Sequence, residues 1–527
     1  MKKLQVWLPL LFAVIMVAGM RIGYKLRGNV PFSNDFFSSN KGSSLQEVME
    51  LVRNNYVDPV STDSLTEDAV QAMLANLDPH SVFIPAVHLR EVNEDLQGNF
   101  QGIGVEFYII RDTVHVTSVL KDGPSDQAGL KPGDRFLKVG DSVVTGNGIN
   151  AERIKNLLRG RGGSAVNVTL QRGGTQIPAT ITRGTIPLYS VDAAYMIDAV
   201  TGYIHLNKFS GSSYEEFMQA MEKLQEQGMQ KMIFDLRENG GGILNEAVDI
   251  ADEFLNDNKL IVYTEGEKQS KTEYHCKRPG LFEKGALAVL VDEGSASASE
   301  VVAGAVQDWD RGIIIGRRSF GKGLVQEQYN LSNGAAIRLT VARYYTPTGR
   351  SIQKPYVKGR TAYNEEVLER FNNGEMIHQD SIHAPLGPAF KTKGGRTVFG
   401  GGGITPDIFI AFDTTTFSDA LNPLFYNQEF GKFIYHYYIS NKSFFDQYKN
   451  PSDFAARYQD TRKAWNELVN YVGTDSLQQV SEKDKVEIEK RIKTWMARQI
   501  WRMDGYYQVN NLYDRVVQRA LDELKKN

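Results

Sequence analysis

The chain has little cysteine and little net charge, and both shortages limit what it can be. Its 527 residues include a single cysteine, Cys276, so no intramolecular disulfide can staple the fold. The formal net charge is −3, from 60 basic and 63 acidic residues, and no basic stripe extends beyond a few residues. We therefore expect no nucleic-acid-binding role. A chain of this length is expected to fold as about two to four domains.

Metal, nucleotide and histidine chemistry also have little support. Cys276 with the adjacent His275 is a weak basis for a metal site, and a passive thiol is the favoured interpretation. The three-glycine turn Gly240–Gly242 lacks the G-x-G-x-x-G spacing and the lysine of a phosphate-binding loop, which argues against a nucleotide site. None of the eight histidines lies in a glycine-flanked motif, and His80 is interpreted as a turn or packing residue. A Ser-His-Asp triad stays open, because its members can lie far apart in a sequence.

The longest apolar run lies at the N-terminus. Two lysines precede Leu4–Met20, which is 17 residues long. As a helix this run would span about 25 Å, a marginal length for a bilayer. The order of lysines and then apolar residues is typical of a secretion signal. Because no A-x-A cleavage site follows and Arg21 comes directly after the run, an uncleaved signal anchor is favoured over a cleaved signal peptide for residues 1–26. Residues 27–44 are predicted to be a linker.

The rest of the chain alternates between helical and strand-rich patterns. Residues 45–97 are predicted to form an N-terminal helical region, because apolar positions recur three and four residues apart. Short strand-like runs between Gly and Pro turns, with one helix, predict a small β-rich domain over residues 98–184. Strands and helices alternate over residues 185–410, which predicts an α/β core with parallel strands covered on both faces. Residues 411–527 are predicted to be helical, with aromatic side chains that serve packing.

Three segments of the α/β region could carry chemistry. Asp235–Leu244, "DLRENGGGIL", follows a buried strand and precedes a helix, so its glycines let backbone N–H groups approach a ligand closely. Gly294–Glu300, "GSASASE", also lies between a strand and a helix. Gly316–Gln328, "GRRSFGKGLVQEQ", holds a lysine between two glycines. Taken alone, the first segment could be a flexible turn, the second the start of a helix and the third a solvated loop. The presence of all three segments in one domain favours an active site.

The serines of "GSASASE" have two interpretations. Ser297 and Glu300 fit the S-x-x-E capping box, with Val301 and Val302 on the buried face of the helix that follows. A serine at such a turn can also be exposed near the positive end of a helix, which favours an oxyanion. The segment is not a G-x-S-x-G elbow, so a hydrolase would need a base from elsewhere in the chain.

Lys322 is the base that the sequence offers. It is flanked by Gly321 and Gly323, which let it approach another element closely. A lysine acts as a base only when its amine is neutral, and burial without a carboxylate partner lowers its pKa toward that state. Gln326 follows four residues later and can orient the amine.

The motifs, in their order, resemble the carboxyl-terminal processing protease family, also called tail-specific proteases. The resemblance covers residues 45–410 and depends on several motifs together, since any one of them alone would be weak. They are "YVD", "LDPHS", "GIGV", "GPSDQAGLKPGDRFLKVGD", "DLRENGGGIL", "GSASASE", "RRSFGKGLVQ", "LTVARYYTPTGRSIQ" and "GGGITPDI". The resemblance implies a crotonase-like or ClpP-like α/β protease core with an inserted PDZ domain and helical N- and C-terminal segments.

The resemblance also assigns roles to residues. It implies that Ser297 is the nucleophile, that Lys322, 25 residues later, is the base, and that Gln326 supports the lysine. The family often has Asn-Pro-Gly-Gly where this chain has Asn-Gly-Gly-Gly. The oxyanion hole is implied to use the backbone N–H groups of Ala298 and of Gly241 or Gly242.

The small β-rich domain resembles a PDZ domain. A PDZ domain adds a peptide as an extra strand and holds its terminal carboxylate on backbone N–H groups. In "FQGIGVEF" the resemblance implies that Gly102, Ile103 and Gly104 face the carboxylate and that Val105 lies on the pairing strand. The alternative is a degenerate PDZ domain that serves as a spacer.

Together these features predict a serine endopeptidase with a Ser-Lys dyad and no metal or cofactor. Its expected substrates are proteins or peptides with an apolar C-terminus, and the resemblance implies a homodimer. The N-terminal segment predicts a place in the cell envelope, on the periplasmic side and anchored in the inner membrane. A non-catalytic PDZ scaffold that binds peptides and a Ser-His hydrolase acting on an ester or lipid are the alternatives.

Overall fold

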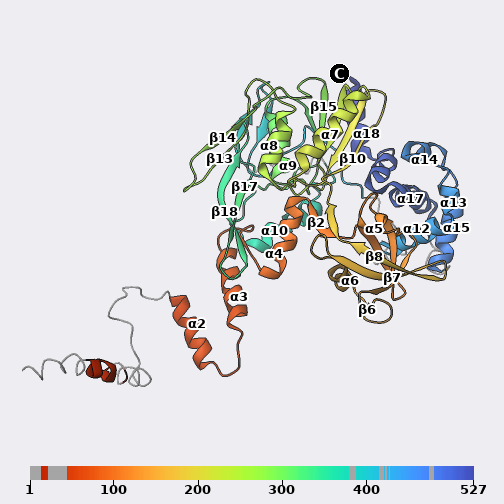
Figure 1. Cartoon of the computed structure of the whole chain (residues 1–527). Helices are drawn as coiled ribbons and strands as arrows, with labels where there is room; N and C mark the ends of the chain where they lie inside the picture. The colour runs from red at the N-terminus through yellow and green to blue at the C-terminus, as the bar shows by residue number, and fades with distance from the viewer. Residues whose placement is uncertain are drawn as a thin grey trace, which may run out of the picture. The chain divides into compact units, whose positions relative to one another are not determined.

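A computed structural model gives the structure of the chain (Figure 1). It describes residues 13–19, 21, 44–378, 387–414, 421, 424–425, 428–473 and 480–526. The chain divides into two compact units, residues 1–70 and residues 71–527. Most of the predicted signal segment and nearly all of the predicted linker lie outside the described residues. Within the described ranges, no helix has the length and apolarity needed to cross a membrane.

The N-terminal helical pattern forms three helices and a short strand. The first unit holds α2 (Ser44–Asn55), which buries none of its residues, and the start of α3 (Thr62–Ala75). The second unit continues with β1 (Val82–Ile84) and α4 (Ala86–Gln97). Helix α4 ends at Gly98, whose φ of 75° is the left-handed conformation that glycine adopts without a steric penalty. The strand within this region was not predicted.

The β-rich domain is an antiparallel sheet with two helices. Its strands are in the order β3-β4-β5-β7-β8, and β6 pairs with β5. Strands β2 and β9 pair with each other where the chain enters and leaves the domain. The core is made of fully buried aliphatic and aromatic side chains, including Val114, Phe136 and Ile154. The elements are β2 (Asn99–Gly102), β3 (Val105–Ile110), β4 (Thr113–Val119), α5 (Pro124–Gln127), β5 (Arg135–Val139), β6 (Ser142–Val143), α6 (Ala151–Leu158), β7 (Ala165–Arg172), β8 (Thr175–Thr182) and β9 (Gly184–Pro187).

The α/β core is built on a six-stranded sheet in the order β10-β11-β12-β15-β16-β21. Strands β11 to β21 of this order are parallel, whereas the edge strand β10 is antiparallel to β11, a difference from the parallel arrangement that we predicted. The strands are β10 (Val191–Met196), β11 (Thr201–Leu206), β12 (Lys231–Asp235), β15 (Ala286–Val291), β16 (Ile313–Gly316) and β21 (Ile408–Phe409). The helices packed on the sheet are α7 (Ser213–Glu226), α8 (Leu244–Asp252), α9 (Ala298–Asp308) and α18 (Arg515–Lys526).

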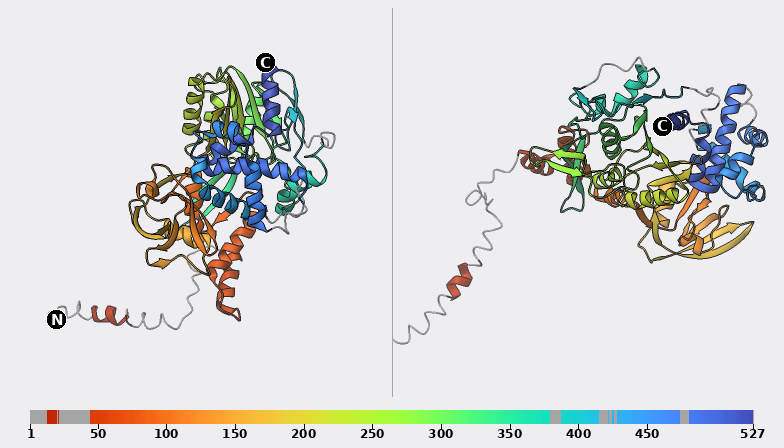
Figure 2. Two further views of the ribbon diagram at one scale, coloured as in Figure 1. Left: turned by 90° about the vertical axis from the view of Figure 1, so that its right-hand side faces the viewer. Right: turned by 90° about the horizontal axis from the view of Figure 1, so that it is seen from above.

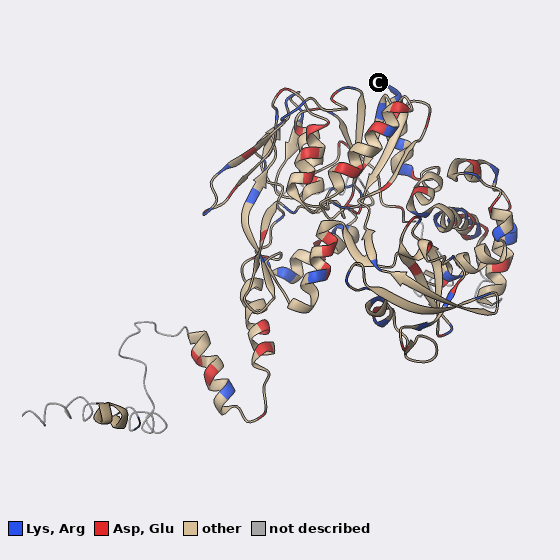
Figure 3. Ribbon diagram, in the orientation of Figure 1, with Lys and Arg blue, Asp and Glu red and all other residues tan. Residues whose placement is uncertain are grey.

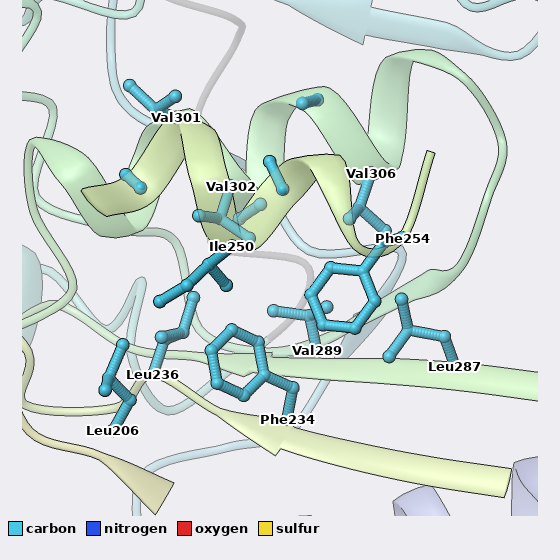
Figure 4. Packing of buried hydrophobic residues seen from close by; sticks show 14 of the residues in the cluster. Leu206, Phe234, Leu236, Ile250, Phe254, Leu287, Val289, Val301, Val302 and Val306 are labelled. Atoms are coloured by element: carbon cyan, nitrogen blue, oxygen red, sulfur yellow. The ribbon is translucent and has the colours of Figure 1, made fainter. Parts of the chain in front are cut away.

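The two faces of this sheet are covered by different parts of the chain. Alternate strand residues such as Phe234 and Val289 point to α8 and α9, where they meet Ile250, Phe254 and Val302 (Figure 4). The residues between them on the strands point to the other face and pack against α18. Full burial of one such side chain contributes about 1.5–3 kcal/mol, so both layers hold the sheet firmly. The sheet is thus covered on both faces, as predicted.

A second sheet, which is antiparallel, lies beside the core, and Lys322, the predicted base, precedes its strand β17. Its strands are in the order β1-β18-β13-β14, with β17 paired to β18. The pairing of β1 with β18 brings the segment after α3 next to the strands that follow Lys322. The elements of this part are β13 (Leu260–Glu265), β14 (Thr272–His275), β17 (Leu324–Asn330), β18 (Ala336–Tyr345), α10 (Arg360–Asn372), β19 (Ala389–Lys391) and β20 (Thr397–Phe399).

The C-terminal region is helical, as predicted. Its helices are α12 (Glu429–Ser440), α13 (Lys442–Phe445), α14 (Pro451–Arg457), α15 (Thr461–Val472), α17 (Glu482–Asn510) and α18. Aromatic and aliphatic side chains from α12 to α17 form their own core, which agrees with the packing role expected for them. The C-terminal helices also lie beside the β-rich domain (Figure 2). From helix α17, Gln499 donates a hydrogen bond to the backbone C=O of Thr117 and Arg502 pairs with Glu106.

Acidic and basic residues are intermingled along the helices and strands rather than gathered in one stripe (Figure 3).

Cys276 is buried, and burial raises the pKa of its thiol to about 12. The neighbouring His275 ring contacts the C=O of Asn258 and the carboxylate of Glu273. Within the described part of the chain, no cluster of three or more His, Cys, Asp and Glu residues has the arrangement of a metal site.

Candidate active site

Ser297 lies at the turn between strand β15 and helix α9. Its backbone has a φ of 55° and a ψ of −113°, a strained conformation for a residue other than glycine. The flanking serines are buried and bonded to the backbone: Ser295 Oγ donates to the C=O of Leu236 and Ser299 Oγ to the C=O of Asn239, both at 2.8 Å. Ser297 is the one of the three that is partly exposed, so the geometry separates it from its neighbours.

Glu300 joins the start of helix α9 to the segment that carries Lys322. The predicted capping box forms, and the Glu300 carboxylate accepts the N–H of Ser297 at 2.8 Å. The same oxygen accepts the N–H of Lys322, also at 2.8 Å. Its other oxygen accepts the Ser319 hydroxyl at 2.5 Å and the Gly321 N–H at 2.7 Å. One buried carboxylate therefore holds the backbones of Ser297 and Lys322 side by side.

The environment of Glu300 is unusual for a carboxylate. It is fully buried, and burial raises its pKa to about 7 while the hydrogen bonds that it accepts oppose this rise. Tyr344 reinforces the same junction, because its buried hydroxyl is within hydrogen-bonding reach of the C=O groups of Ser297 and Lys322. The sequence indicated a capping role for Glu300 and no role for Tyr344. The contacts of both side chains with the Lys322 backbone could not be predicted, because they join segments far apart in the chain.

Lys322 has the surroundings that a lysine base needs. Burial, and next the charge of Arg338, lower the pKa of its amine, while Glu300 and Asp78 act in the opposite direction. None of the ion pairs formed among the described residues includes Lys322. Its Nζ donates a hydrogen bond to Oε1 of Gln326 at 3.0 Å. The lysine is therefore oriented by a neutral amide.

The "LDPHS" turn holds Gln326 from the other side. The Gln326 amide donates to the backbone C=O of His80. Asp78 fixes this turn by accepting the N–H groups of His80 and Ser81, each at 2.8 Å, and the Ser81 hydroxyl at 2.5 Å. A support thus runs from Asp78 through the turn to Gln326 and on to Lys322. The Asp-Pro pair indicated a turn, but only the pairing of β1 with β18 places it beside the lysine.

His80 is also part of the site through its side chain. Its Nε2 lies 2.9 Å from the hydroxyl of Tyr363. Burial, and next the charge of Lys322, lower the pKa of His80 to about 4, so the ring is neutral at physiological pH. The sequence interpretation as a turn residue is correct for its backbone, but it missed the proximity of His80 to Lys322.

The three-glycine turn lies against Ser297. Gly241 has a φ of 95°, and a Cβ added there would lie 2.7 Å from the C=O oxygen of Ala296 and 2.8 Å from Cβ of Ser297. Gly242 has a φ of 145°, and a Cβ there would lie 2.1 Å from the C=O oxygen of Phe209. Both positions require glycine, whereas a Cβ at Gly240 would meet no atom within 4 Å.

Asn239 organises this turn. Its side chain donates to the C=O of Leu206 at 2.7 Å and accepts the N–H of Gly241 at 2.9 Å. Its own C=O accepts the N–H of Ala296 at 2.9 Å. The sequence predicted N–H groups of this turn and of Ala298 as oxyanion donors. The N–H of Gly241 is already bonded to Asn239 within the turn. Ala298 lies at the first position of helix α9.

The predicted peptide-binding loop of the β-rich domain is the connection from β2 to β3. Gly102 ends β2, Ile103 is buried, Gly104 has a φ of 73° and Val105 begins β3. Strand β3 pairs with β4 on one side and, in the described part of the chain, with no strand on the other. It is therefore an edge to which an extended peptide can add.

Three family models match parts of the chain. The model of "Peptidase family S41" matches residues 200–360, "PDZ domain" matches residues 101–182, and a "Family of unknown function (DUF8443)" matches residues 420–502. A "Carboxy-terminal-processing protease" of Bartonella bacilliformis is 35% identical over 342 residues, which cover 64% of this chain and 78% of the relative.

Two solved structures are similar to parts of the chain. A "Photosystem II D1 C-terminal processing protease" is 29% identical, with 59% of this chain and 84% of that chain covered and a TM-score of 0.34. The "PDZ domain of Carboxy-Terminal Protease from Vibrio cholerae in Complex with Peptide" is 27% identical, with 17% of this chain and 99% of that chain covered and a TM-score of 0.16. The sequence match to the curated relative, over most of its length, carries the assignment: the chain belongs to the S41 family of serine peptidases, the C-terminal processing proteases, and includes a PDZ domain.

Proposed function

We propose that the chain is an endopeptidase with a Ser-Lys dyad formed by Ser297 and Lys322. The observation that carries the proposal is the common anchorage of the two residues: their backbone N–H groups are each 2.8 Å from one oxygen of the buried Glu300 carboxylate. The lowered pKa of Lys322 and its hydrogen bond to Gln326 add to the support, because a base must be largely neutral and correctly oriented.

In the proposed reaction Lys322 accepts the hydroxyl proton of Ser297 as Oγ attacks the scissile carbonyl carbon. The C–N bond of the peptide then breaks, and the protonated amine of Lys322 returns the proton to the leaving nitrogen. Water attacks the resulting ester, and the acid product leaves with Ser297 restored. The oxyanion is assigned to the N–H groups of Ala298 and Gly242, because the N–H of Gly241, the other candidate, already donates to Asn239. Each donor of this kind contributes about 3–4 kcal/mol in other hydrolases.

We also propose that the PDZ domain selects substrates by an apolar C-terminus. The free edge of β3 and the connection Gly102–Val105 support this role, together with a relative whose PDZ domain was solved with a peptide. The location in the cell envelope with an inner-membrane anchor, a homodimer and the crotonase-like or ClpP-like character of the core are proposals of the same kind, supported by the N-terminal sequence and the family resemblance.

The dyad is tested with Ser297→Ala and Lys322→Ala on an unfolded protein that ends in apolar residues. Each variant should lose cleavage, while the exposed-lysine control Lys268→Ala should keep it. Wild-type cleavage by either dyad variant would show that the dyad is wrong. A scaffold without activity would leave Ser297 unlabelled by an acylating probe in the wild-type chain.

A further inference from the structure

Arg237, in the segment that leads into the three-glycine turn, has a partner from the far end of the chain. Its Nε and Nη2 donate to the fully buried carboxylate of Asp235, with a shortest distance of 2.6 Å. Its Nη1 donates to Oδ2 of Asp514 at 2.9 Å. Arg237 and Asp514 are themselves mostly buried, with side-chain exposures of 16% and 14%. An ion pair so shielded from water is held in a defined geometry.

Asp514 is fixed by a second set of contacts. Its Oδ1 accepts the N–H groups of Val516 and Val517 at 2.9 and 3.1 Å, so it is the N-cap residue of α18. Helix α18 is anchored on the sheet by buried side chains, among them Val517 and Leu524. Figure 1 shows this helix beside strand β15, at the C-terminal end of the chain. One carboxylate therefore divides its oxygens between the helix and Arg237.

Neighbouring C-terminal residues reach the same end of the sheet. The Tyr507 hydroxyl lies 3.0 Å from Nε2 of His205, and the two rings stack at 4.2 Å. His205 is the register partner of Asp235 in the adjacent strand. Asn511 donates to the hydroxyl of Tyr195 at 2.9 Å. The C-terminal segment thus contacts β10, β11 and the segment that follows β12.

The position of Arg237 bears directly on the turn beside Ser297. Glu238 follows with a φ of 59° and donates its N–H to Asp292. Asn239 comes next and accepts the N–H of Gly241, where an added Cβ would lie 2.8 Å from Cβ of Ser297. Only one residue separates Arg237 from Asn239. A displacement of the Arg237 side chain is therefore expected to move the backbone of the three-glycine turn.

We propose that Asp514 is a positioning residue of the active site, which acts through Arg237 to hold the three-glycine turn against Ser297. It touches neither substrate nor reacting atoms. The inference rests on the proposed function, because a misplaced turn matters to the rate only if Ser297 is the nucleophile. It also assigns a task in catalysis to the C-terminal helix, beyond covering one face of the sheet.

Asp514→Asn tests the proposal with little harm to the helix. Asparagine caps a helix about as well as aspartate, but its amide then turns an NH₂ group toward Arg237 in place of an anion. The matched control is Asp522→Asn on the same helix, where the carboxylate is 67% exposed and pairs with Lys525. The assay measures kcat and KM on a peptide with an apolar C-terminus, the labelling rate of Ser297 by an acylating probe, and peptide binding by the PDZ domain.

The expected result is a kcat about tenfold to a hundredfold lower for Asp514→Asn, since small displacements of catalytic groups have effects of this size. KM and peptide binding should change by less than about twofold, because the PDZ loop is not altered. In an Arg237→Gln background the Asp514→Asn change should have no further effect, because the partner through which it acts is gone.

Three outcomes would overturn the proposal. One is an Asp514→Asn variant with the kcat of Asp522→Asn, while Ser297→Ala is inactive; the proposed function would then stand without this residue. Another is a loss of kcat on adding Asp514→Asn to Arg237→Gln that equals its loss in the wild-type background, because Asp514 would then act without Arg237. The third is full activity of Ser297→Ala, which would refute the proposed function and with it the inference.

Discussion

Replacing Gly241 by alanine is a sharp test of the site, because Gly240 beside it provides the control. At Gly241 the new Cβ would lie 2.7 Å from the C=O oxygen of Ala296, 2.8 Å from Cβ of Ser297 and 2.9 Å from the N–H nitrogen of Ala298. Two of these three contacts are with backbone atoms, which cannot rotate away. The φ of 95° adds a penalty of about 1–2 kcal/mol for an L-residue.

The turn at Gly241 must therefore move away from Ser297, or the serine must move. A misplacement of about 1 Å at a reacting centre costs about a hundredfold in rate. We expect kcat of Gly241→Ala to fall by about that factor. For Gly240→Ala, whose added Cβ would meet nothing within 4 Å, we expect kcat within about threefold of the wild type.

The assay is cleavage of a fluorogenic peptide with an apolar C-terminus, with kcat and KM fitted separately. Chemical unfolding of both variants shows whether the fold has survived, and peptide binding by the PDZ domain shows whether that domain is intact. If Gly241→Ala is folded and as active as Gly240→Ala, the turn does not form part of the catalytic site and the reasoning fails.

Four further predictions concern the base, its neighbours and the PDZ loop. The activity should rise with pH as the amine of Lys322 loses its proton, with a midpoint below the ordinary lysine range because burial lowers its pKa, and a pH–rate profile without that rise would contradict a lysine base. The profile should show no inflection near pH 6.5 from His80, whose pKa of about 4 keeps it neutral. Asp78→Ala should lower kcat by about tenfold with KM unchanged, since the turn that holds Gln326 loses three hydrogen bonds, and an unchanged kcat would remove this turn from the site. Gly104→Ala should raise KM several-fold for peptides with an apolar C-terminus, because the φ of Gly104 is 73° and an added Cβ would lie 3.1 Å from Ile186. An equal rise in KM for a substrate without an apolar C-terminus would contradict a role of Gly104 in recognising that end.

Local patterns gave a large part of the fold. The alternation of apolar strands with amphipathic helices predicted the α/β core, and S-x-x-E predicted the start of helix α9, because periodicity and capping depend on residues close together in the chain. The antiparallel pairing of β10 escaped prediction, since strand direction depends on how the connection folds back. Strand β1 escaped for a similar reason: its three residues become a strand only when β18 is beside them.

The sequence by itself determined the chemical groups of the site and their order: a serine at a helix start, a lysine between two glycines, a glutamine four residues on, and a turn of glycines. Tertiary structure decided how they are held. Glu300 bonds to Lys322 across 22 residues, Gln326 to His80 across 246, and Arg237 to Asp514 across 277. No propensity or periodicity encodes such contacts, because each depends on the packing of whole sheets and helices that bring distant segments within hydrogen-bonding distance.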